Sequence, residues 1–324
     1  MDEANNQESY GDGSTCLASD IRGSGLRGGA EVERTLRAFI SRHFRYLTTI
    51  PSTLIIVMIS GFPIAYVIYI SFFVRNLLQG QIYFTGLTNY VGILMDPMFW
   101  KYLKLTCIYM VMSVAIGFPL SLLIAWALDQ TGKVKLLFLS IILLPWLIPV
   151  IATSIMWRWL LHDIYGLINI VLLNMKIISA PINWLGESGT AMLCLILTDI
   201  WYRNPFDILI LYAGMQRVPP ELNEAANMDG ASSWRFFRHI VLPEIKPDIL
   251  IVLVIRTMFV FREVGLPFTL TRGGPGESTE VLAVRVYKLT NLFLRQGQGA
   301  TISVLMLVIT LMIVLAYFRA LKRD

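Results

Sequence analysis

The chain has little charge and few cysteines for its length. Of 324 residues, 15% are charged and 56% are hydrophobic, whereas soluble domains are about 25% charged and about 45–50% apolar. This balance, with a mean hydropathy of +0.63, excludes an ordinary soluble domain. Cys16, Cys107 and Cys194 show no CxxC or Cys/His ligand spacing, which argues against a disulfide framework and a metal site.

The chain also lacks the short motifs of the common catalytic sites. It has no GxxxxGK[ST] loop to bind ATP, no GxSxG and no HExxH. Its three histidines, His43, His162 and His239, are scattered. We therefore predict no catalytic residue, no metal and no cofactor in this chain. The net charge of +5 reflects unequal loops rather than a nucleic-acid surface.

Long apolar segments dominate the rest of the chain. A helix needs about 20 apolar residues to cross a bilayer, and six runs of this kind are present: 47–73, 103–128, 136–160, 190–213, 248–270 and 300–318. They are too long and too continuously apolar for the strands of a membrane barrel. The sequence therefore predicts an all-α integral membrane protein with six transmembrane helices within 47–320.

The basic residues indicate the orientation of these spans. If the N-terminus is cytoplasmic, the tails and loops on that side hold 15 Lys and Arg, against 7 on the other side. The positive-inside rule then places both termini in the cytoplasm. Residues 1–30 lack an apolar core, so we predict a disordered cytoplasmic tail and no cleavable signal. Residues 31–46 have the pattern of a basic amphipathic helix on the inner surface of the membrane.

The longest predicted cytoplasmic loop, 214–247, has the pattern of a helix followed by a turn. Pro220 suits the first helical turn, and Glu221 and Glu224 lie near the positive helix start. Gly230 can adopt the left-handed conformation that ends a helix. One narrow face carries mostly small side chains: Leu222, Ala225, Ala226 and Asp229. Such a face allows another protein to approach closely.

A second short helix is predicted in the same loop. Ser232 or Ser233 can cap its start, its body contains Trp234, Phe236, Phe237 and Ile240, and we expect Pro243 to close it. The sequence of the loop thus predicts a helix–turn–helix on the inner face of the membrane.

This loop resembles the EAA loop of binding-protein-dependent ABC importer permeases, most of all the maltose-transporter branch. The resemblance rests on Glu224-Ala225-Ala226, Asp229-Gly230-Ala231 and Leu242-Pro243. It extends over roughly residues 50–320 through further similar motifs: Pro145-Trp146, Pro149, Trp157, Gly166, Asn169, Trp201, Pro205-Phe206, Thr271, Gly273-Gly274-Pro275 and Thr279-Glu280.

The resemblance implies a permease of the MetI-like importer fold in a bacterial inner membrane. It implies a second, homologous permease chain as a heterodimer partner, two ATPase subunits that hold ATP and Mg, and an extracytoplasmic solute-binding protein. The loop would be the coupling helix that docks on the ATPase. In that role Glu224 makes polar contacts, Ala225 and Ala226 allow close seating, and Gly230 permits the turn. Asp229 belongs to the same set of coupling residues.

Several charged residues fall inside the predicted spans, where a charge is costly and usually faces a cavity or a partner. Asp199, Arg203 and Asp207 share one face of the fourth span, and Arg256 and Arg262 lie in the fifth. We predict that Arg203, Arg256 and Arg262, with Asp199, line the translocation path. The alternative is ion pairing within the chain or snorkelling.

The resemblance implies a carbohydrate substrate, and the arginines favour an acidic one such as an alginate fragment. Neutral oligosaccharides and solutes of the glycerol-phosphate type remain alternatives. A secondary transporter or channel is compatible with the composition alone, although no inverted repeat is visible.

Overall fold

The computed structural model describes residues 49–321, so the predicted tail 1–30 and amphipathic helix 31–46 lie outside the described residues. The chain divides into two units, one up to Ala65 and one from Tyr66 onward. The described part of the first unit is an apolar helix that includes a π-helical turn, η1 (Val57–Gly61), and the start of α2 (Phe62–Ser71). No residue from 49 to 65 is buried, as expected of a helix that lipid or another chain covers.

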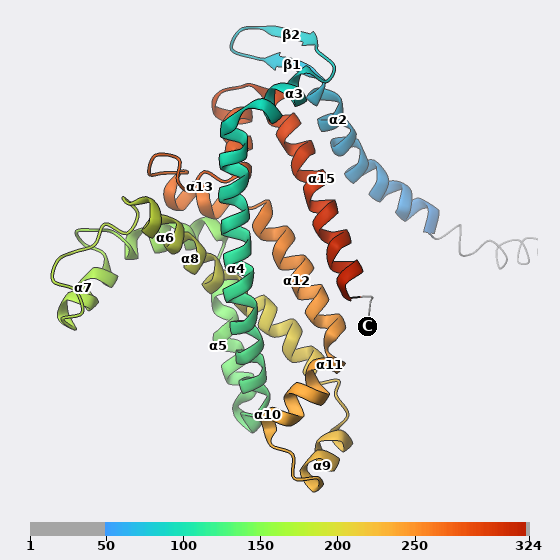
Figure 1. Ribbon diagram of the computed structural model, residues 1–324, viewed down its shortest axis with the longest axis vertical. Helices are drawn as coiled ribbons and strands as arrows, with labels where there is room; N and C mark the ends of the chain where they lie inside the picture. The colour runs from blue at the N-terminus through green and yellow to red at the C-terminus, as the bar shows by residue number, and fades with distance from the viewer. Residues whose placement is uncertain (1–48, 322–324) are drawn as a thin grey trace, which may run out of the picture. The chain divides into compact units, whose positions relative to one another are not determined.

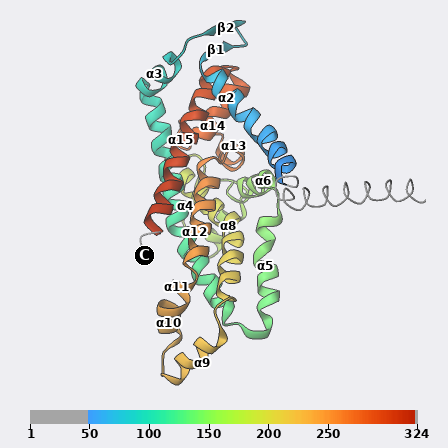
Figure 2. The ribbon, with the colours of Figure 1, turned by 90° about the vertical axis from the view of Figure 1, so that its right-hand side faces the viewer.

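The second unit consists almost wholly of helices (Figure 1). Its elements are β1 (Phe73–Asn76), β2 (Gln81–Phe84), α3 (Thr88–Met95), α4 (Pro97–Asp129), η2 (Gly132–Val134), α5 (Lys135–Leu147), α6 (Val150–Leu160), α7 (Leu167–Asn174), α8 (Ser188–Met215), α9 (Pro220–Met228), α10 (Ser233–Phe236), η3 (Phe237–Val241), α11 (Leu242–Glu244), α12 (Lys246–Phe261), α13 (Gly265–Thr271), α14 (Leu282–Tyr287), η4 (Lys288–Leu292) and α15 (Gln296–Leu321). The β1–β2 hairpin lies at one end of this unit and α9 with α10 at the other (Figures 1 and 2).

Helix α4 forms the main packing surface. Asp96 caps its start, with the carboxylate accepting from the Met98 N–H at 2.9 Å, and Pro97 occupies the first turn. One face of α4 is buried at intervals of three or four residues: Phe99, Tyr102, Thr106, Tyr109, Ser113, Gly117, Ser121, Ala125 and Leu128. This face packs against α8 and α12. Small and polar residues in its middle leave room for the charged side chains of those helices.

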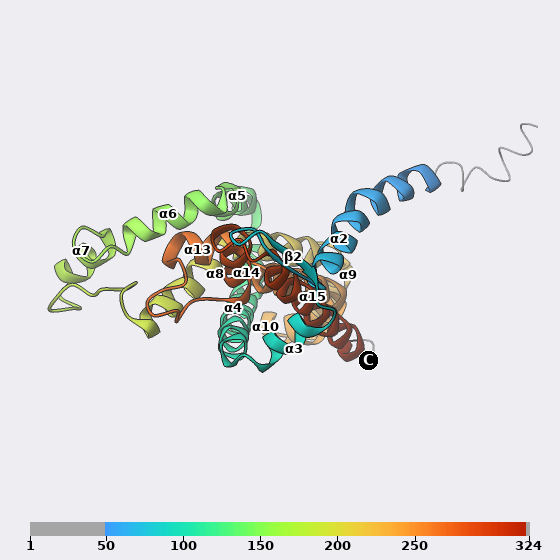
Figure 3. The same cartoon turned by 90° about the horizontal axis from the view of Figure 1, so that it is seen from above.

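The described helices do not all form uninterrupted spans. Within residues 49–321, three helices are long and apolar enough to cross a membrane: Thr49–Ser71, Pro97–Asp129 and Gln296–Ala320. A fourth candidate, α5 with α6, bends by 92°. The bend follows from Pro149, which has no N–H and holds Ile148 in an extended conformation. Figure 3 shows α6 and α7 leading away to one side.

The fourth and fifth predicted spans differ from simple apolar helices for other reasons. Helix α8 is 28 residues long but contains Asp199, Arg203 and Asp207. Helix α12 has only 16 residues, and the fifth span breaks before α13. The sequence predicts six spans, and in the structure the third and the fifth of these are interrupted.

Two local features depart from the sequence predictions. The segment after α2 forms an antiparallel hairpin, with Phe73 opposite Phe84 and Asn76 opposite Gln81, and Gly80 has a positive φ in its turn. Pro243 does not close the second loop helix, because the chain continues through η3 into α11 as far as Glu244. The wide π-helical turn precedes the proline, which cannot donate a helical hydrogen bond.

Candidate functional site

Helix α9 holds the residues of the predicted coupling motif at the tip of the loop. Glu224, Ala225, Asp229 and Gly230 are exposed, whereas Ala226 is buried. The motif therefore presents two acidic side chains, Glu224 and Asp229, and a small-residue surface outward.

The end of α9 has a defined backbone structure. Gly230 has φ +69°, and its N–H donates to the Asn227 carbonyl at 3.1 Å. The Ala231 N–H donates to the Ala226 carbonyl at 2.9 Å. These two bonds are those of a Schellman motif, which favours glycine at the left-handed position. The predicted role of Gly230 in the turn has this geometric basis, and Ser232 caps α10 by accepting from the Arg235 N–H at 3.4 Å.

The loop is anchored to the helices by aromatic packing. Trp126 of α4 contacts Trp234 and Phe237, with ring centroids 5.7 and 5.0 Å apart. Phe237 and Val241 are buried in one cluster with residues of α4, α8 and α12: Ala125, Leu128, Ile208, Leu211, Tyr212, Met215, Ile245 and Val252. A force on α9 therefore reaches three long helices through closely packed side chains.

An ion pair closes the base of the loop. Arg217, just after α8, donates through Nη2 to Asp248 Oδ2 in the first turn of α12 at 2.5 Å. Gly214 leaves space for that carboxylate, because a Cβ atom there would lie 2.7 Å from Asp248 Oδ2. The two ends of the 214–247 loop are thus held together.

A first group of buried charges joins α4, α8 and the break in the fifth span. Arg203 Nε donates to Asp199 Oδ1 at 2.6 Å, and its Nη2 donates to Glu263. Asp199 also accepts from Tyr109 OH at 2.8 Å and from Ser113 Oγ at 2.5 Å. Glu263 in turn accepts from the Leu266 N–H at 3.3 Å, at the start of α13. Arg203 therefore links α8 to Glu263, which lies just before α13.

A second group surrounds Arg256, which is only 1% exposed. Its Nη1 donates to Asp207 and, at 2.8 Å, to Asn204 Oδ1. Its Nη2 donates to Ser113 Oγ at 3.3 Å. Ser113 thus connects the two groups. Gly117 makes room for the guanidinium, because a Cβ atom there would lie 1.9 Å from Arg256 Nη2.

The arginines are balanced by carboxylates. Two guanidinium groups, on Arg203 and Arg256, face three carboxylates, on Asp199, Asp207 and Glu263. The i, i+4, i+8 spacing on α8 predicts part of this neutralisation. Sequence reasoning missed the partners on other helices, namely Tyr109, Ser113, Gly117, Asn204 and Glu263. None of these has a local motif that identifies its partner.

The same region contains a cavity of about 470 Å³. Its lining combines aromatic and apolar side chains with both ion pairs: Trp146, Val150, Tyr202, Arg203, Phe206, Asp207, Ile255, Arg256, Phe259 and Glu263. Trp146 and Phe206 stack with centroids 5.2 Å apart. Of the four residues predicted to line the path, Arg203 and Arg256 line this cavity, and Asp199 lies behind them.

Arg262 lies apart from this network. Its guanidinium stacks on the ring of Phe259 at 4.8 Å, and it lines a different hollow beside α15. The structure therefore separates one of the three predicted arginines from the other two.

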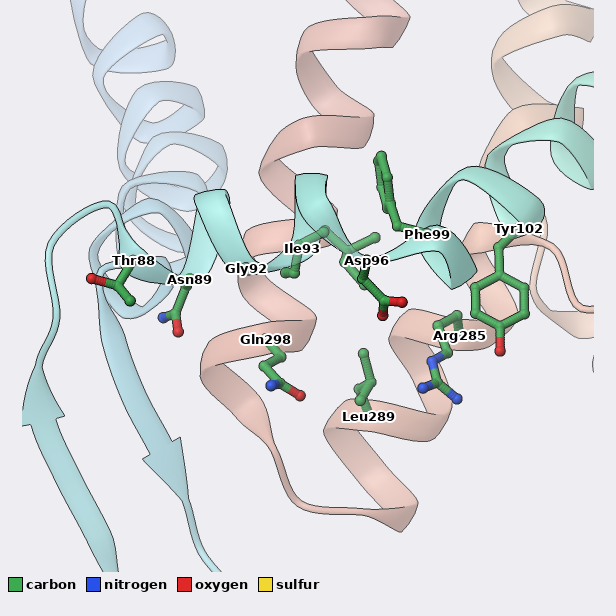
Figure 4. A pocket seen from close by; sticks show the side chains of 11 residues that line it. Thr88, Asn89, Gly92, Ile93, Asp96, Phe99, Tyr102, Arg285, Leu289 and Gln298 are labelled. Atoms are coloured by element: carbon green, nitrogen blue, oxygen red, sulfur yellow. The ribbon is translucent and has the colours of Figure 1, made fainter.

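The end that carries the hairpin has its own polar cluster. Lys101 Nζ donates to Glu277 Oε2 at 3.1 Å, and Lys288 Nζ donates to Glu280 Oε2 at 2.5 Å. Burial raises the pKa of Glu277, but hydrogen bonding with Lys101 and Tyr102 and the positive charges of Lys101 and Arg285 together leave that pKa below its ordinary value. A nearby pocket of about 250 Å³ is lined by Asp96, Tyr102 and Arg285 among others (Figure 4).

Comparison with known proteins gives a consistent picture. The family described as "Binding-protein-dependent transport system inner membrane component" matches residues 117–323. The chain is 33% identical to the trehalose/maltose transport system permease MalF of Thermococcus litoralis, over 74% of this chain and 81% of that protein. It is 31% identical to the sulfoquinovosyl glycerol transport system permease SmoG of Agrobacterium fabrum, over 84% of this chain and 88% of that protein.

Among solved structures, the fold is similar to a chain of a bacterial ABC transporter involved in the import of the acidic polysaccharide alginate. The TM-score is 0.74 at 23% identity, over 89% of this chain and 98% of that chain. The permease fold predicted from the sequence is therefore confirmed.

Proposed function

The chain belongs to the family of binding-protein-dependent transport system inner membrane components, and on this premise we propose that it forms half of the path through which an ATP-driven importer moves a carbohydrate. Its partners in this proposal are a second homologous permease, two ATPase subunits that hold ATP and Mg, and an extracytoplasmic solute-binding protein. The chain lies in the bacterial inner membrane with both termini cytoplasmic. ATP is bound and hydrolysed by the partner subunits, not by this chain.

The observation that carries the proposal is the coupling loop. Exposed Glu224 and Ala225 lie on a short helix whose end is fixed by Gly230. The loop base is closed by the contact between Arg217 and Asp248. A secondary transporter or channel has no need of a rigid docking helix at the tip of a cytoplasmic loop. In our proposal the ATPase dimer closes, α9 moves with it, and the packed helices change the side on which the path opens.

The cavity beside α8 and α12 is the proposed wall of the path. Flat aromatic surfaces at Trp146, Phe206 and Phe259 suit the apolar faces of sugar rings, and the fixed charges of Arg203 and Glu263 can bond to hydroxyl groups. Relatives named for trehalose/maltose and for sulfoquinovosyl glycerol transport support a carbohydrate.

The charge balance bears on which carbohydrate is carried. Arg203 and Arg256 are each paired with a carboxylate, and Arg262 lines another hollow. The prediction of an acidic sugar thus loses the support of these arginines. We propose a neutral, hydroxyl-rich oligosaccharide as the first candidate. An acidic sugar and a glycerol-phosphate-type solute are the competing outcomes of the test.

The test is uptake by the reconstituted complex in vesicles that contain ATP, with neutral and acidic oligosaccharides and glycerol phosphate offered through the binding protein. Loss of an aromatic contact at the wall, by Trp146→Leu, should raise the KM for the carried carbohydrate roughly tenfold. Trp159→Leu is the matched control, because Trp159 is exposed on α6 and does not line the cavity that contains Trp146. Uptake that needs no ATP, or equal KM values for both variants, would contradict the proposal.

A further inference from the structure

A continuous groove runs along α15 on the side away from the charged cavity. Two hollows of about 520 and 330 Å³ share Val264, Ala283, Val286 and Ser303 and therefore adjoin. We call them together the arginine groove, because each contains one arginine, Arg75 in the first and Arg262 in the second. Helix α15 lines the groove from Gln296 to Thr310, a length of about 21 Å at the usual rise per residue.

The groove is positively charged without a compensating carboxylate. No Asp or Glu is among the described residues that line either hollow. Arg75 Nη1 donates to Tyr66 OH at 3.0 Å, while its Nε is buried and has no hydrogen-bond partner in the described part of the chain. Arg262 contacts an aromatic ring rather than an acid. The charged cavity on the other side of Phe259 differs, because there each arginine has an acidic partner.

Arg75 is half-buried, whereas Arg262 is exposed. The half-buried positive charge of Arg75 is costly unless an anion pairs with it. A ligand of the groove should therefore carry a negative charge. The unpartnered Nε of Arg75 is a donor already directed away from water. A single anionic oxygen would satisfy it.

The two ends of the groove differ in polarity. The end near the hairpin is lined by polar side chains, namely Arg75, Tyr287, Thr290, Asn291 and Gln296. The other end is mostly apolar, with Met258, Phe261, Met306 and Leu307. Arg262 is two residues from Val264, which lines both hollows, and so lies near the boundary between them. The bridge between Asn76 and Arg295 places the start of α15 at the hairpin.

We propose that the arginine groove binds one anionic phospholipid from the leaflet on the hairpin side. The phosphate lies at the polar end against Arg75, and one acyl chain follows the apolar end along Met306 and Leu307. The length of the groove suits this ligand, since one leaflet contributes about 15 Å of hydrocarbon below its headgroups. A sugar suits it less well, because the deeper half offers few hydrogen-bonding groups. The proposal does not depend on which solute the charged cavity carries.

The test uses the purified importer complex in bilayer discs with equal amounts of phosphatidylglycerol and phosphatidylethanolamine, without substrate or ATP. Lipid that remains bound after transfer to detergent is counted by native mass spectrometry. We expect about tenfold enrichment of phosphatidylglycerol in the wild type. The double variant Arg75→Gln/Arg262→Gln should lose that enrichment. The control Arg158→Gln/Arg272→Gln removes the same number of charges and should keep the enrichment, because neither arginine lines either hollow.

A second variant tests the proposal independently, in case the double variant misfolds. Leu307→Trp fills the apolar end while both arginines remain, and it should also reduce the enrichment. Equal retention of the two lipids by the wild type would overturn the proposal, as would full enrichment in both variants. Displacement of the retained lipid by a soluble hexuronate oligosaccharide would make the groove a carbohydrate site and overturn it as well.

Discussion

Gly117 of α4 lies directly against the guanidinium of Arg256 of α12, and a Cβ atom at position 117 would come within 1.9 Å of Arg256 Nη2. The absence of a side chain on one helix thus allows a fully buried cation on another. The guanidinium holds Asp207, Asn204 and Ser113 in place. Three helices therefore meet at this contact.

Gly117→Ala should displace Arg256 and leave Asp207 without its partner. Breaking a buried ion pair costs about 3–5 kcal/mol, so the purified complex should unfold at a clearly lower temperature. Gly189→Ala on α8 is the control, because a Cβ atom there meets nothing within 4 Å. Equal melting temperatures for the two variants would show that the close approach of Gly117 and Arg256 does not contribute to stability.

The pair between Arg256 and Asp207 should show strong coupling in a double-mutant cycle. Asp207→Leu alone leaves a buried cation and should destabilise the complex by about 3–5 kcal/mol. Adding Arg256→Met removes that cation and should restore much of the loss. Thermal unfolding of the four proteins measures the coupling. Additive effects would mean that the two side chains act independently.

Asp248→Asn should loosen the base of the coupling loop, because Arg217 then loses its ionic partner. Arg217 is largely exposed, so the expected effect is on coupling rather than on stability. ATP hydrolysis stimulated by the loaded binding protein should fall while basal hydrolysis stays the same. Glu244→Gln, an exposed acid in α11, should leave both rates unchanged. The idea fails if the two variants behave alike.

The contact between Lys101 and Glu277 should respond to acid. The pKa of Glu277 lies below its ordinary value. The contact therefore stabilises the folded state at every pH above the ordinary pKa of a glutamate. The stabilisation is lost as the pH falls through the lowered pKa. Both side chains are more than a third exposed, 41% and 42%, so the effect is small. Melting curves of wild type and Glu277→Gln should differ at pH 6 and converge in stronger acid. A difference in melting temperature that grows as the pH falls would contradict this pH dependence.

Local signals in the sequence predicted where the first helix of the 214–247 loop begins and ends. Pro220 and Gly230 fix where α9 starts and stops through their own backbone preferences, and the structure shows both roles. The charged face of α8 was also predictable from spacing along one helix. Such features depend only on neighbours in the chain.

The cross-helix partners could not be predicted in the same way. Ser113 lies 86 residues from Asp199 and 143 from Arg256, and only packing brings them together. Glu263 gains its role from the break in the fifth span, which periodicity does not reveal. The hairpin at 73–84 was missed because its strands are only four residues each. Its apolar residues were also assigned to the end of the first predicted span and to the loop that follows it.

The central claim is that α9 couples this permease to an external ATPase, and one measurement tests it most directly. ATP hydrolysis by the reconstituted complex is recorded with and without loaded binding protein, for wild type, Glu224→Lys and the control Glu187→Lys, another exposed acid. We predict that stimulation disappears in Glu224→Lys and persists in Glu187→Lys. Full stimulation of hydrolysis and transport in Glu224→Lys would contradict the coupling role and reopen the secondary-transporter or channel interpretation.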